Sequence, residues 1–374
     1  MILGDMGADV IKVEAPGRGD DTRHWGPPFA QGGESAYFVC ANRNKRSMTL
    51  NLKAEQGLEI LKDLIRKGDV LIENFRVGTL ESWGLSHDEL QRIRPGLIYC
   101  TITGYGYTGP YRHRPGYDLV IQAQGGIMSI TGPADGEPYK VGVAITDITA
   151  GLFACNAILA SLFNRQQTGE GQRIDISLLD SQVAWLANVA SNYLISAERP
   201  GRYGNAHPNI APYQTFKALD GYFALGIGND NQWSKFCDRL GKIEWAKDER
   251  FITNADRIKN KDALISLMNT LFEQHHVAYW LSKLEAIGIP CAPINTIDRV
   301  FDDPQVQARE MHINVNHPTA GTLSLVGSPL KIPSSPTQVR LPPPLLGEHT
   351  EDILHNVLGY DLEALKSLRK SGVI

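Results

Sequence analysis

The segments Asp69–Phe75 (DVLIENF) and Leu97–Thr103 (LIYCTIT) are short apolar runs bounded by polar residues. Such runs are typical of buried strands. Thr79–Arg92, between them, has a helical pattern, and Ala54–Lys67, before them, repeats leucine and isoleucine on one helical face. Because strands and helices alternate in this order, we predict an α/β fold with a parallel sheet and helices on both faces.

The loops that follow these two strands are expected to lie together. Right-handed crossovers place the carboxyl ends of parallel strands at the same edge of a sheet. The two loops contain Asn74-Phe75-Arg76 and Gly104–Gly106. Ligands of open α/β sheets bind at this edge, so we expect a functional site there.

The rest of the chain suggests a second, smaller domain. Asp220-Gly221 separates two strand-like runs and predicts a β-hairpin. Polar helices follow, and we interpret residues 205–297 as a smaller α+β domain. The final helical segment, Glu351–Ser371, is too short to fold alone and is expected to pack on the first domain. Further strands are predicted at residues 10–14, 47–52, 172–178 and 322–326, and a long helix at 179–196.

Composition excludes several classes of function. With 42% apolar and 21% charged residues and a net charge of −4, the chain is typical of a globular protein without a nucleic-acid or membrane surface. No stretch reaches the ~18 apolar residues of a membrane span. Five scattered cysteines without a C-x-x-C pair predict free thiols in a cytoplasmic, reducing compartment. The only close histidine pair, His275-His276, is adjacent, so a metal site is not expected.

The chain also begins in an unusual way. Met1–Asp9 has the pattern of the end of a helix and passes directly into the strand at Val10. Because a domain rarely opens inside an element, we expect that a segment precedes Met1.

Asp147 is the most notable carboxylate in the sequence. In Val141–Leu152 (VGVAITDITAGL) a strand-like run precedes it and a helical pattern follows it. It is therefore either an N-cap, which stabilises a helix by ~1 kcal/mol, or a nucleophile at the end of a strand. These residues alone favour the cap. Nucleophile-elbow and Walker A motifs are missing, and Gly104–Gly109 (GYGYTG), which has G-x-G-x-x-G spacing, lies in a Gly/Pro/Tyr loop and does not open a helix. The basic clusters Arg43–Arg46 and Arg112–Arg114 are candidates for binding a phosphorylated ligand.

Together, the motifs resemble those of class III CoA-transferases, the formyl-CoA and carnitine CoA-transferase family. The resemblance spans essentially the whole chain and is closest to the succinyl-CoA:glutarate type. The motifs that carry it include GADVIKVE (7–14), NRNKRS (42–47), ENF (73–75), TDITAG (146–151), GIPCAPIN (288–295) and LLGEHT (345–350). WGPPF (25–29) and PPPLLG (342–347) support the narrower placement.

This resemblance implies a fold, an activity and a site. Residues 1–200 would begin a large Rossmann-like domain, 298–374 would return to it, and two chains would interlock as a homodimer. Asp147 aligns with the catalytic aspartate, which would move CoA from succinyl-CoA to a dicarboxylate such as glutarate through anhydride and thioester intermediates. CoA thioesters would be substrates, with no permanently bound cofactor. Leu50, Lys53, Asn74 and Phe75 match positions along the CoA groove of the family, and Asp118 matches an acid beside the site. Two basic contacts of the formyl-CoA enzymes fall here on Ala15 and Ser82, so Arg76, Arg23 and Arg114 are the candidates for holding the phosphates. Tyr117, next to Asp118, is a further candidate for the CoA site.

Three alternatives remain. The related 2-methylacyl-CoA racemases place a histidine base where Tyr117 stands here, and tyrosine is a poor base near neutral pH. A CoA-binding protein without activity would result if the first strand and helix of the family are missing. A Rossmann oxidoreductase is disfavoured because the one G-x-G-x-x-G spacing, at 104–109, is in a loop and does not open a helix.

Overall fold

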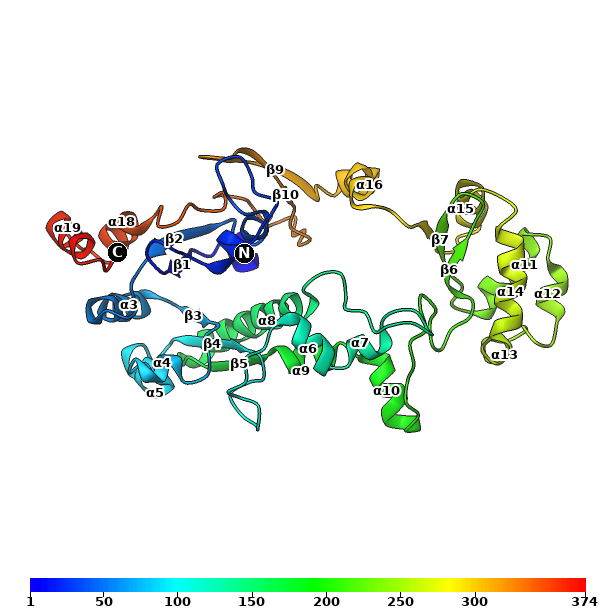
Figure 1. Ribbon diagram of the computed structural model, residues 1–374, viewed down its shortest axis with the longest axis horizontal. Helices are drawn as coiled ribbons and strands as arrows, with labels where there is room; N and C mark the ends of the chain where they lie inside the picture. The colour runs from blue at the N-terminus through cyan, green and yellow to red at the C-terminus, as the bar shows by residue number, and fades with distance from the viewer. The chain divides into compact units, whose positions relative to one another are not determined.

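The computed structural model describes all residues, 1–374. The chain forms two compact units (Figure 1), which we describe separately. Unit 1 comprises Met1–Gly116, Ile148–Leu178 and Arg299–Ile374, and unit 2 comprises Tyr117–Asp147 and Leu179–Asp298. The domain ranges 1–200, 205–297 and 298–374 stay predictions.

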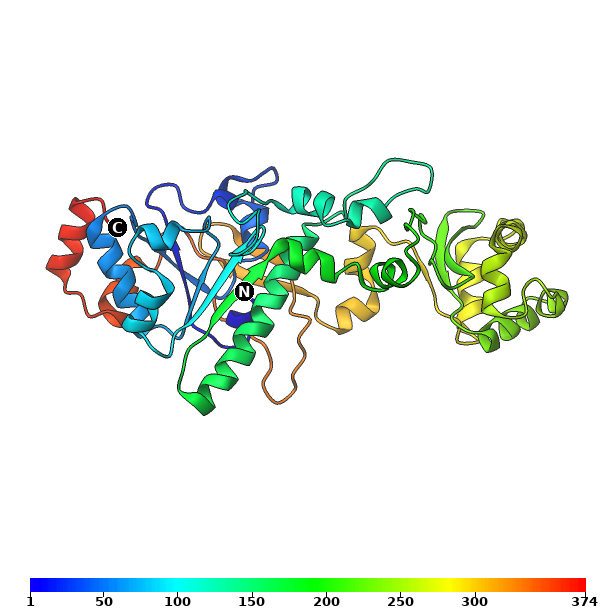
Figure 2. The same ribbon diagram turned by 90° about the horizontal axis from the view of Figure 1, so that it is seen from below.

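A parallel sheet with helices on both faces forms the centre of unit 1. Its strands are β3 (Val70–Glu73), β4 (Ile98–Thr103) and β5 (Arg173–Ser177), in that order. Alternate residues of β4 point to opposite faces. Ile98 and Cys100 pack with Ile158 of α8 (Ile145–Thr168), which runs along the sheet in Figure 2. Leu97 and Tyr99 belong to a second core with α3 (Glu55–Lys67) and α5 (His87–Ile93), which confirms the α/β prediction.

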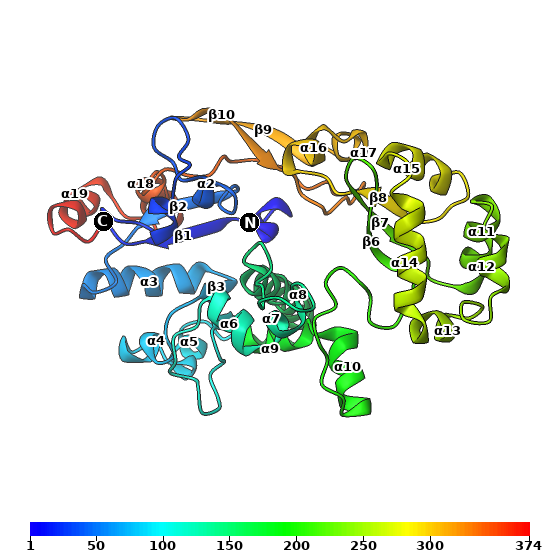
Figure 3. The same ribbon diagram turned by 45° about the vertical axis from the view of Figure 1, so that its right-hand side comes forward.

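A second parallel pair, β1 (Val10–Glu14) and β2 (Lys45–Thr49), also belongs to unit 1. Helix α3 lies between this pair and α4 (Thr79–Ser82) with α5 (Figure 3). Leu365 and Leu368 of α19 (Leu362–Lys370) join the same core as Met48, which confirms that the C-terminal helix packs on the first part of the chain. The segment before it forms α18 (Thr350–Asp352) and a π-helical turn, η2 (Ile353–Val357).

Two helix predictions in the sequence were wrong in their length. The segment 79–92 is divided into α4 and α5, because Gly84 adopts a positive φ of 75° and Ser86 then caps α5 by accepting from the amide of Glu89. The segment 179–196 is likewise divided into α9 (Leu178–Ala184) and α10 (Ala187–Ser196), where Ala187 has a φ of 43°.

Unit 2 contains the predicted hairpin. Strands β6 (Tyr213–Lys217) and β7 (Tyr222–Gly226) pair antiparallel, and β8 (Cys291–Pro293) adds to β7. Phe216 and Phe223 pack against an aromatic core from α11 (Asp230–Arg239), α14 (Lys261–Phe272) and α15 (Val277–Glu285). The fully buried Arg257 donates to the carbonyls of Ala211, Phe251 and Ile252 and to Asp230, so its charge is compensated.

The remaining elements are shorter. In unit 1 they are α1 (Ile2–Asp5), η1 (Asp21–His24), α2 (Ala36–Val39), α17 (Pro304–Ala308) and the antiparallel pair β9 (His312–His317) and β10 (Gly321–Val326). In unit 2 they are α6 (Asp118–Gln124), α7 (Ile127–Ile130), α12 (Ile243–Lys247) and α13 (Asn254–Lys259), while α16 (Ile297–Asp302) spans the boundary.

Helix α8, with 24 residues, is long and apolar enough to span a membrane by length and composition, since an 18-residue window within it has a mean hydropathy of 1.5. Core helices of globular proteins meet the same criteria. Here Ala150, Ala154 and Ile158 form a buried stripe, and the latter two pack on β4 and β5. This packing accounts for the apolar residues on the face of α8 that covers the sheet.

Candidate active site

Asp147 lies in the first turn of α8. The helix begins at Ile145, so Asp147 is its third residue and not its N-cap. The strand predicted before Asp147 does not form. The N–H of Val141, which a neighbouring strand would bind, instead donates to Oε1 of Gln122 at 2.8 Å. Both the strand and the cap prediction were therefore wrong, and Asp147 makes no side-chain hydrogen bond that would assign it a structural role.

The helix is capped by a carboxylate from elsewhere in unit 2. Oδ1 of Asp118, at the start of α6, accepts from the backbone N–H of Thr146 at 2.9 Å and from its hydroxyl group. The other oxygen, Oδ2, accepts from Nε2 of Gln122 at 2.7 Å. Thr146 and Gln122 are both buried. A hydrogen-bonded chain thus runs from Val141 through Gln122 and Asp118 to Thr146, and it fixes both ends of the segment that leads to Asp147.

This arrangement changes the acidity of Asp147. Partial desolvation raises the pKa of its carboxyl group, and the nearby carboxylate of Asp118 raises it further, to about 6. Solvent still reaches the side chain of Asp147. A group with this pKa is largely ionised at neutral pH, yet it is more basic and more nucleophilic than an ordinary aspartate. Asp147 is thus an accessible, unpaired carboxylate, as a nucleophile requires.

The predicted CoA residues that follow β3 lie in an exposed loop of unit 1. The side-chain amide of Asn74 donates to the carbonyl of Ile102, and the ring of Phe75 packs edge-on against Trp83 at 5.3 Å between centroids. Arg76 is exposed and makes no side-chain ion pair. Its guanidinium group is therefore available to an anionic ligand. Asn74, Phe75 and Arg76 stay predicted CoA contacts.

Leu50 and Lys53 differ sharply in exposure. Leu50 is only 2% exposed and packs in the core with Met48, whereas Lys53 is exposed and has a free ammonium group. A surface ligand would meet the side chain of Lys53 but not that of Leu50. Both stay predictions as CoA contacts.

Arg114 lies shortly before the point in the sequence where unit 1 passes into unit 2, and Tyr117 lies directly after it. Arg114, in unit 1, is exposed and stacks on the ring of Tyr111 at 3.8 Å. Tyr117, the first residue of unit 2, is 72% exposed and directly precedes Asp118. Sequence adjacency therefore brings Tyr117 and Asp118 together, and hydrogen bonds connect Asp118 to the helix of Asp147.

The phosphate-binding predictions for Arg23 and for Arg43–Arg46 conflict with the structure. Arg43 is buried in an ion pair with Asp5, and Arg46 pairs with Asp9 and Asp352. Arg23 is buried in a bidentate pair with Glu14 and also donates to the carbonyl of Pro344. The carboxylates that these guanidinium groups bind neutralise their charge and fix their orientation, so these arginines stabilise the fold instead.

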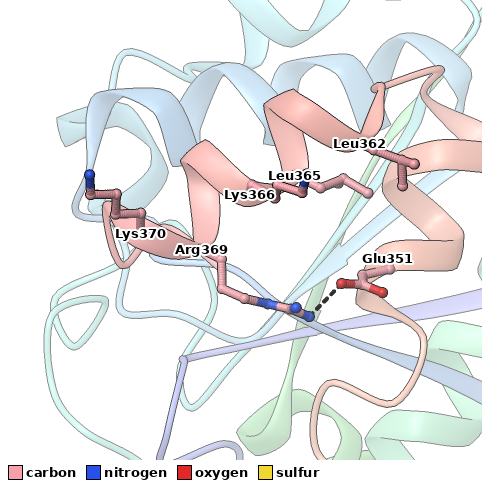
Figure 4. Close-up of a pocket in the computed structure, with 6 residues that line it drawn as sticks. All are labelled: Glu351, Leu362, Leu365, Lys366, Arg369 and Lys370. Carbon is pink, nitrogen blue, oxygen red and sulfur yellow. Dashed lines mark ion pairs between the residues drawn. The ribbon is translucent and has the colours of Figure 1, made fainter.

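One surface cavity lies elsewhere in unit 1. Its lining comes from α18 and α19, and Figure 4 shows the ion pair of Arg369 with Glu351 at 2.6 Å across it. The other lining residues are Leu362, Leu365, Lys366 and Lys370. None of the residues predicted from the sequence is among them, so we do not assign this cavity to the active site.

Sequence reasoning missed Gln122 and Thr146. Gln122 lies four residues after Asp118, one helical turn away, and this spacing was a usable signal. Thr146 precedes Asp147 directly, but no sequence pattern indicates that its N–H is capped by a residue 28 positions away. Such long-range capping becomes visible only in the folded chain.

Comparison with known proteins assigns a family. The model of CoA-transferase family III matches residues 1–350. The chain is 46% identical to succinyl-CoA:glutarate CoA-transferase of Mus musculus over 374 residues, which are 100% of this chain and 86% of that protein. It is 43% identical to succinate–glutarate CoA-transferase of Agrobacterium fabrum over 358 residues, 94% of this chain and 90% of the relative.

A solved structure agrees with this result. The crystal structure of a CAIB/BAIF family protein from Brucella suis is similar with a TM-score of 0.82 and 46% identity, and the match covers 95% of this chain and 93% of that one. The chain therefore belongs to CoA-transferase family III and is an enzyme that transfers coenzyme A between acyl-CoA and acids.

Proposed function

We propose that this enzyme transfers CoA from succinyl-CoA to a dicarboxylate such as glutarate, with Asp147 as the nucleophile. The observation that carries the proposal is the accessible carboxylate of Asp147, unpaired and with a pKa raised to about 6, at a helix start that Asp118 holds in place. The names of the relatives from Mus musculus and Agrobacterium fabrum support the choice of substrates.

The first half of the reaction loads the enzyme. A carboxylate oxygen of Asp147 attacks the thioester carbonyl, the C–S bond breaks, and CoA leaves as a thiolate. The product is an aspartyl–succinyl anhydride. The thiolate then attacks the aspartyl carbonyl of this anhydride, which releases succinate and leaves an aspartyl-CoA thioester. Covalent catalysis of this kind preserves the free energy of the thioester without hydrolysis.

The second half repeats these steps in reverse with the acceptor. A carboxylate of the acceptor attacks the aspartyl-CoA thioester and displaces CoA thiolate, which gives a second anhydride. The thiolate attacks the acceptor's carbonyl, forms the new acyl-CoA, and frees Asp147. No net proton is gained or lost. Amide N–H groups in the first turn of α8 are suitable donors for the oxyanions that develop.

A donor-by-acceptor panel tests the substrate assignment. Succinyl-CoA is offered with glutarate, malate, itaconate, mesaconate, oxalate, formate or carnitine, and new acyl-CoA masses are recorded for the wild type and for Asp147→Ala. We expect a dicarboxyl-CoA product from the wild type alone. α-Deuterium exchange without any acceptor acid would instead support the racemase alternative.

We also propose that the enzyme is a homodimer and that unit 1 is Rossmann-like, as in the family that the chain resembles. Ile148, Leu152, Leu159 and Phe163 form an exposed apolar stripe along α8, and Phe163 is 65% exposed. A second copy would remove this stripe from water. Light scattering should give twice the mass of the chain, and a monomer over the working concentration range would contradict the proposal.

We also propose that the enzyme is cytoplasmic. All five cysteines are free, which supports a reducing compartment such as the cytoplasm. Fractionation of cells that express the tagged full-length protein tests this assignment.

A further inference from the structure

Glu73 is a buried carboxylate without a role in the chemistry described above. It is the last residue of β3 and is only 7% exposed. Oε2 accepts from the backbone N–H of Phe75 at 2.5 Å, and Oε1 accepts from the hydroxyl group of Tyr99 at 3.2 Å. Burying a carboxylate is costly, and an apolar residue at a strand end would avoid this cost. The retention of an acid therefore requires an explanation.

The hydrogen bonds of Glu73 extend to the loop after the neighbouring strand. The hydroxyl group of Tyr99, on β4, lies 3.5 Å from that of Tyr107. The N–H of Tyr107 donates to Asp175 on β5 at 3.0 Å, and the guanidinium group of Arg173 stacks on the Tyr107 ring at 4.0 Å. Glu73 thus connects the loop after β3 with the loop after β4.

The loop after β3 contains three of the predicted CoA contacts, and Glu73 fixes its first turn. Phe75 is held at its backbone by Glu73 and at its ring by Trp83, while Asn74 is held by the carbonyl of Ile102. Without Glu73, the amide of Phe75 would have no partner and the loop would sample other conformations. Ordering it again would then reduce the free energy of ligand binding.

We propose that Glu73 is a positioning residue that holds residues 74–76 in the conformation that binds the CoA part of the substrate. The inference rests on the proposed function, because it takes these residues as part of the CoA groove. Glu73 does not contact the reacting atoms in this account. Its loss should weaken CoA binding and leave the rate at saturation nearly unchanged.

The test compares Glu73→Ala, Glu73→Gln and Tyr99→Phe with the wild type, using calorimetry with free CoA and steady-state kinetics with succinyl-CoA. Glu73→Ala should weaken CoA binding and raise KM by about tenfold, while kcat stays within about threefold. Glu73→Gln should restore most of the affinity, because its amide oxygen can accept from Phe75 and its NH₂ group can donate to Tyr99. Tyr99→Phe should give a smaller loss, and hydrogen exchange of the Phe75 amide should accelerate in Glu73→Ala.

Glu81→Ala is the matched control, since Glu81 is an exposed acid on the neighbouring helix α4. It should leave CoA affinity unchanged. If the wild type binds CoA and Glu73→Ala binds it equally well, the positioning role is refuted while the proposed function stands. If the wild type does not bind CoA, the proposed function fails and the inference fails with it. Should Glu73→Ala not fold, Tyr99→Phe replaces it in the test: CoA affinity equal to that of the wild type and of Glu81→Ala would refute the role.

Discussion

The substitution Asp147→Asn should separate catalysis from stability. Asn has nearly the same shape as Asp but cannot form an anhydride, so transfer should fall by at least about 10³-fold. The fold should not suffer, because the side chain of Asp147 makes no hydrogen bond and the cap of α8 is supplied by Asp118. We expect the variant to be at least as stable as the wild type at neutral pH.

The size of the stability effect follows from the pKa of Asp147. Folding raises this pKa from the ordinary aspartate value of 3.8 to about 6. The folded state therefore binds the proton more tightly than the unfolded state, so the stability from this group is complete below about pH 4 and is lost as the pH rises through about 6. The full shift would correspond to about 3 kcal/mol. Because solvent reaches the side chain, we expect only about 1 kcal/mol.

Urea unfolding of both proteins at pH 4.5, 6 and 8 measures this difference, alongside a transfer assay at pH 8. The gain of Asp147→Asn should be about 1 kcal/mol at pH 8 and should shrink toward pH 4.5. An Asn variant that is less stable than the wild type at pH 8, or that retains transfer activity, would refute the reasoning. The control is an Asp→Asn substitution at an exposed aspartate without an ion pair. Asp135 meets this condition, whereas Asp230 pairs with Arg257 and does not.

Three further predictions concern the groups around the site. Asp118→Asn removes a negative charge, so the acidic limb of the kcat/KM profile, expected near pH 6, should move to lower pH; an unmoved limb would contradict the coupling. Gln122→Ala leaves the amide of Val141 unpaired, so urea unfolding should show a free energy of unfolding lower by about 2 kcal/mol, and kcat should fall at least tenfold. A wild-type kcat would show that the network does not position the nucleophile. Arg43→Ala leaves Asp5 as an unpaired buried charge and should lower the free energy of unfolding by about 3–5 kcal/mol without changing CoA affinity. The control Arg112→Ala, at an exposed arginine, should leave stability intact. Weaker CoA binding at full stability in Arg43→Ala would restore the phosphate-site hypothesis.

The sequence predicted those features that depend on local periodicity. Strands β3 and β4, helix α3 and the hairpin at Asp220-Gly221 each have a pattern of apolar or turn residues that is complete within a few positions. The strand prediction before Asp147 was wrong because Val141–Ile145 contains a glycine and has no strand partner. Its backbone is bound by Gln122, a partner that no local pattern reveals.

The candidate site residues also differ in whether their signal is local in the sequence or depends on distant contacts. Asp147 was found because a motif surrounds it, whereas its raised pKa results from partial burial and from Asp118, which lies 29 residues away in the sequence. The cluster Arg43–Arg46 was misinterpreted because a run of basic residues does not show which acids lie beside it in the fold. Arg43 is paired with Asp5, 38 positions away, and Arg23 is paired with Glu14, nine positions away. Charge patterns alone therefore do not distinguish a ligand site from a buried ion pair.

The most direct test of the account is to trap the covalent intermediate on Asp147. The enzyme is incubated with succinyl-CoA without an acceptor, treated with hydroxylamine or borohydride, digested, and analysed by peptide mass spectrometry. The account predicts a hydroxamate or a reduced side chain at Asp147 that is missing from Asp147→Asn and from enzyme not exposed to succinyl-CoA. Efficient transfer with an unmodified Asp147, or modification at a different residue, would contradict it.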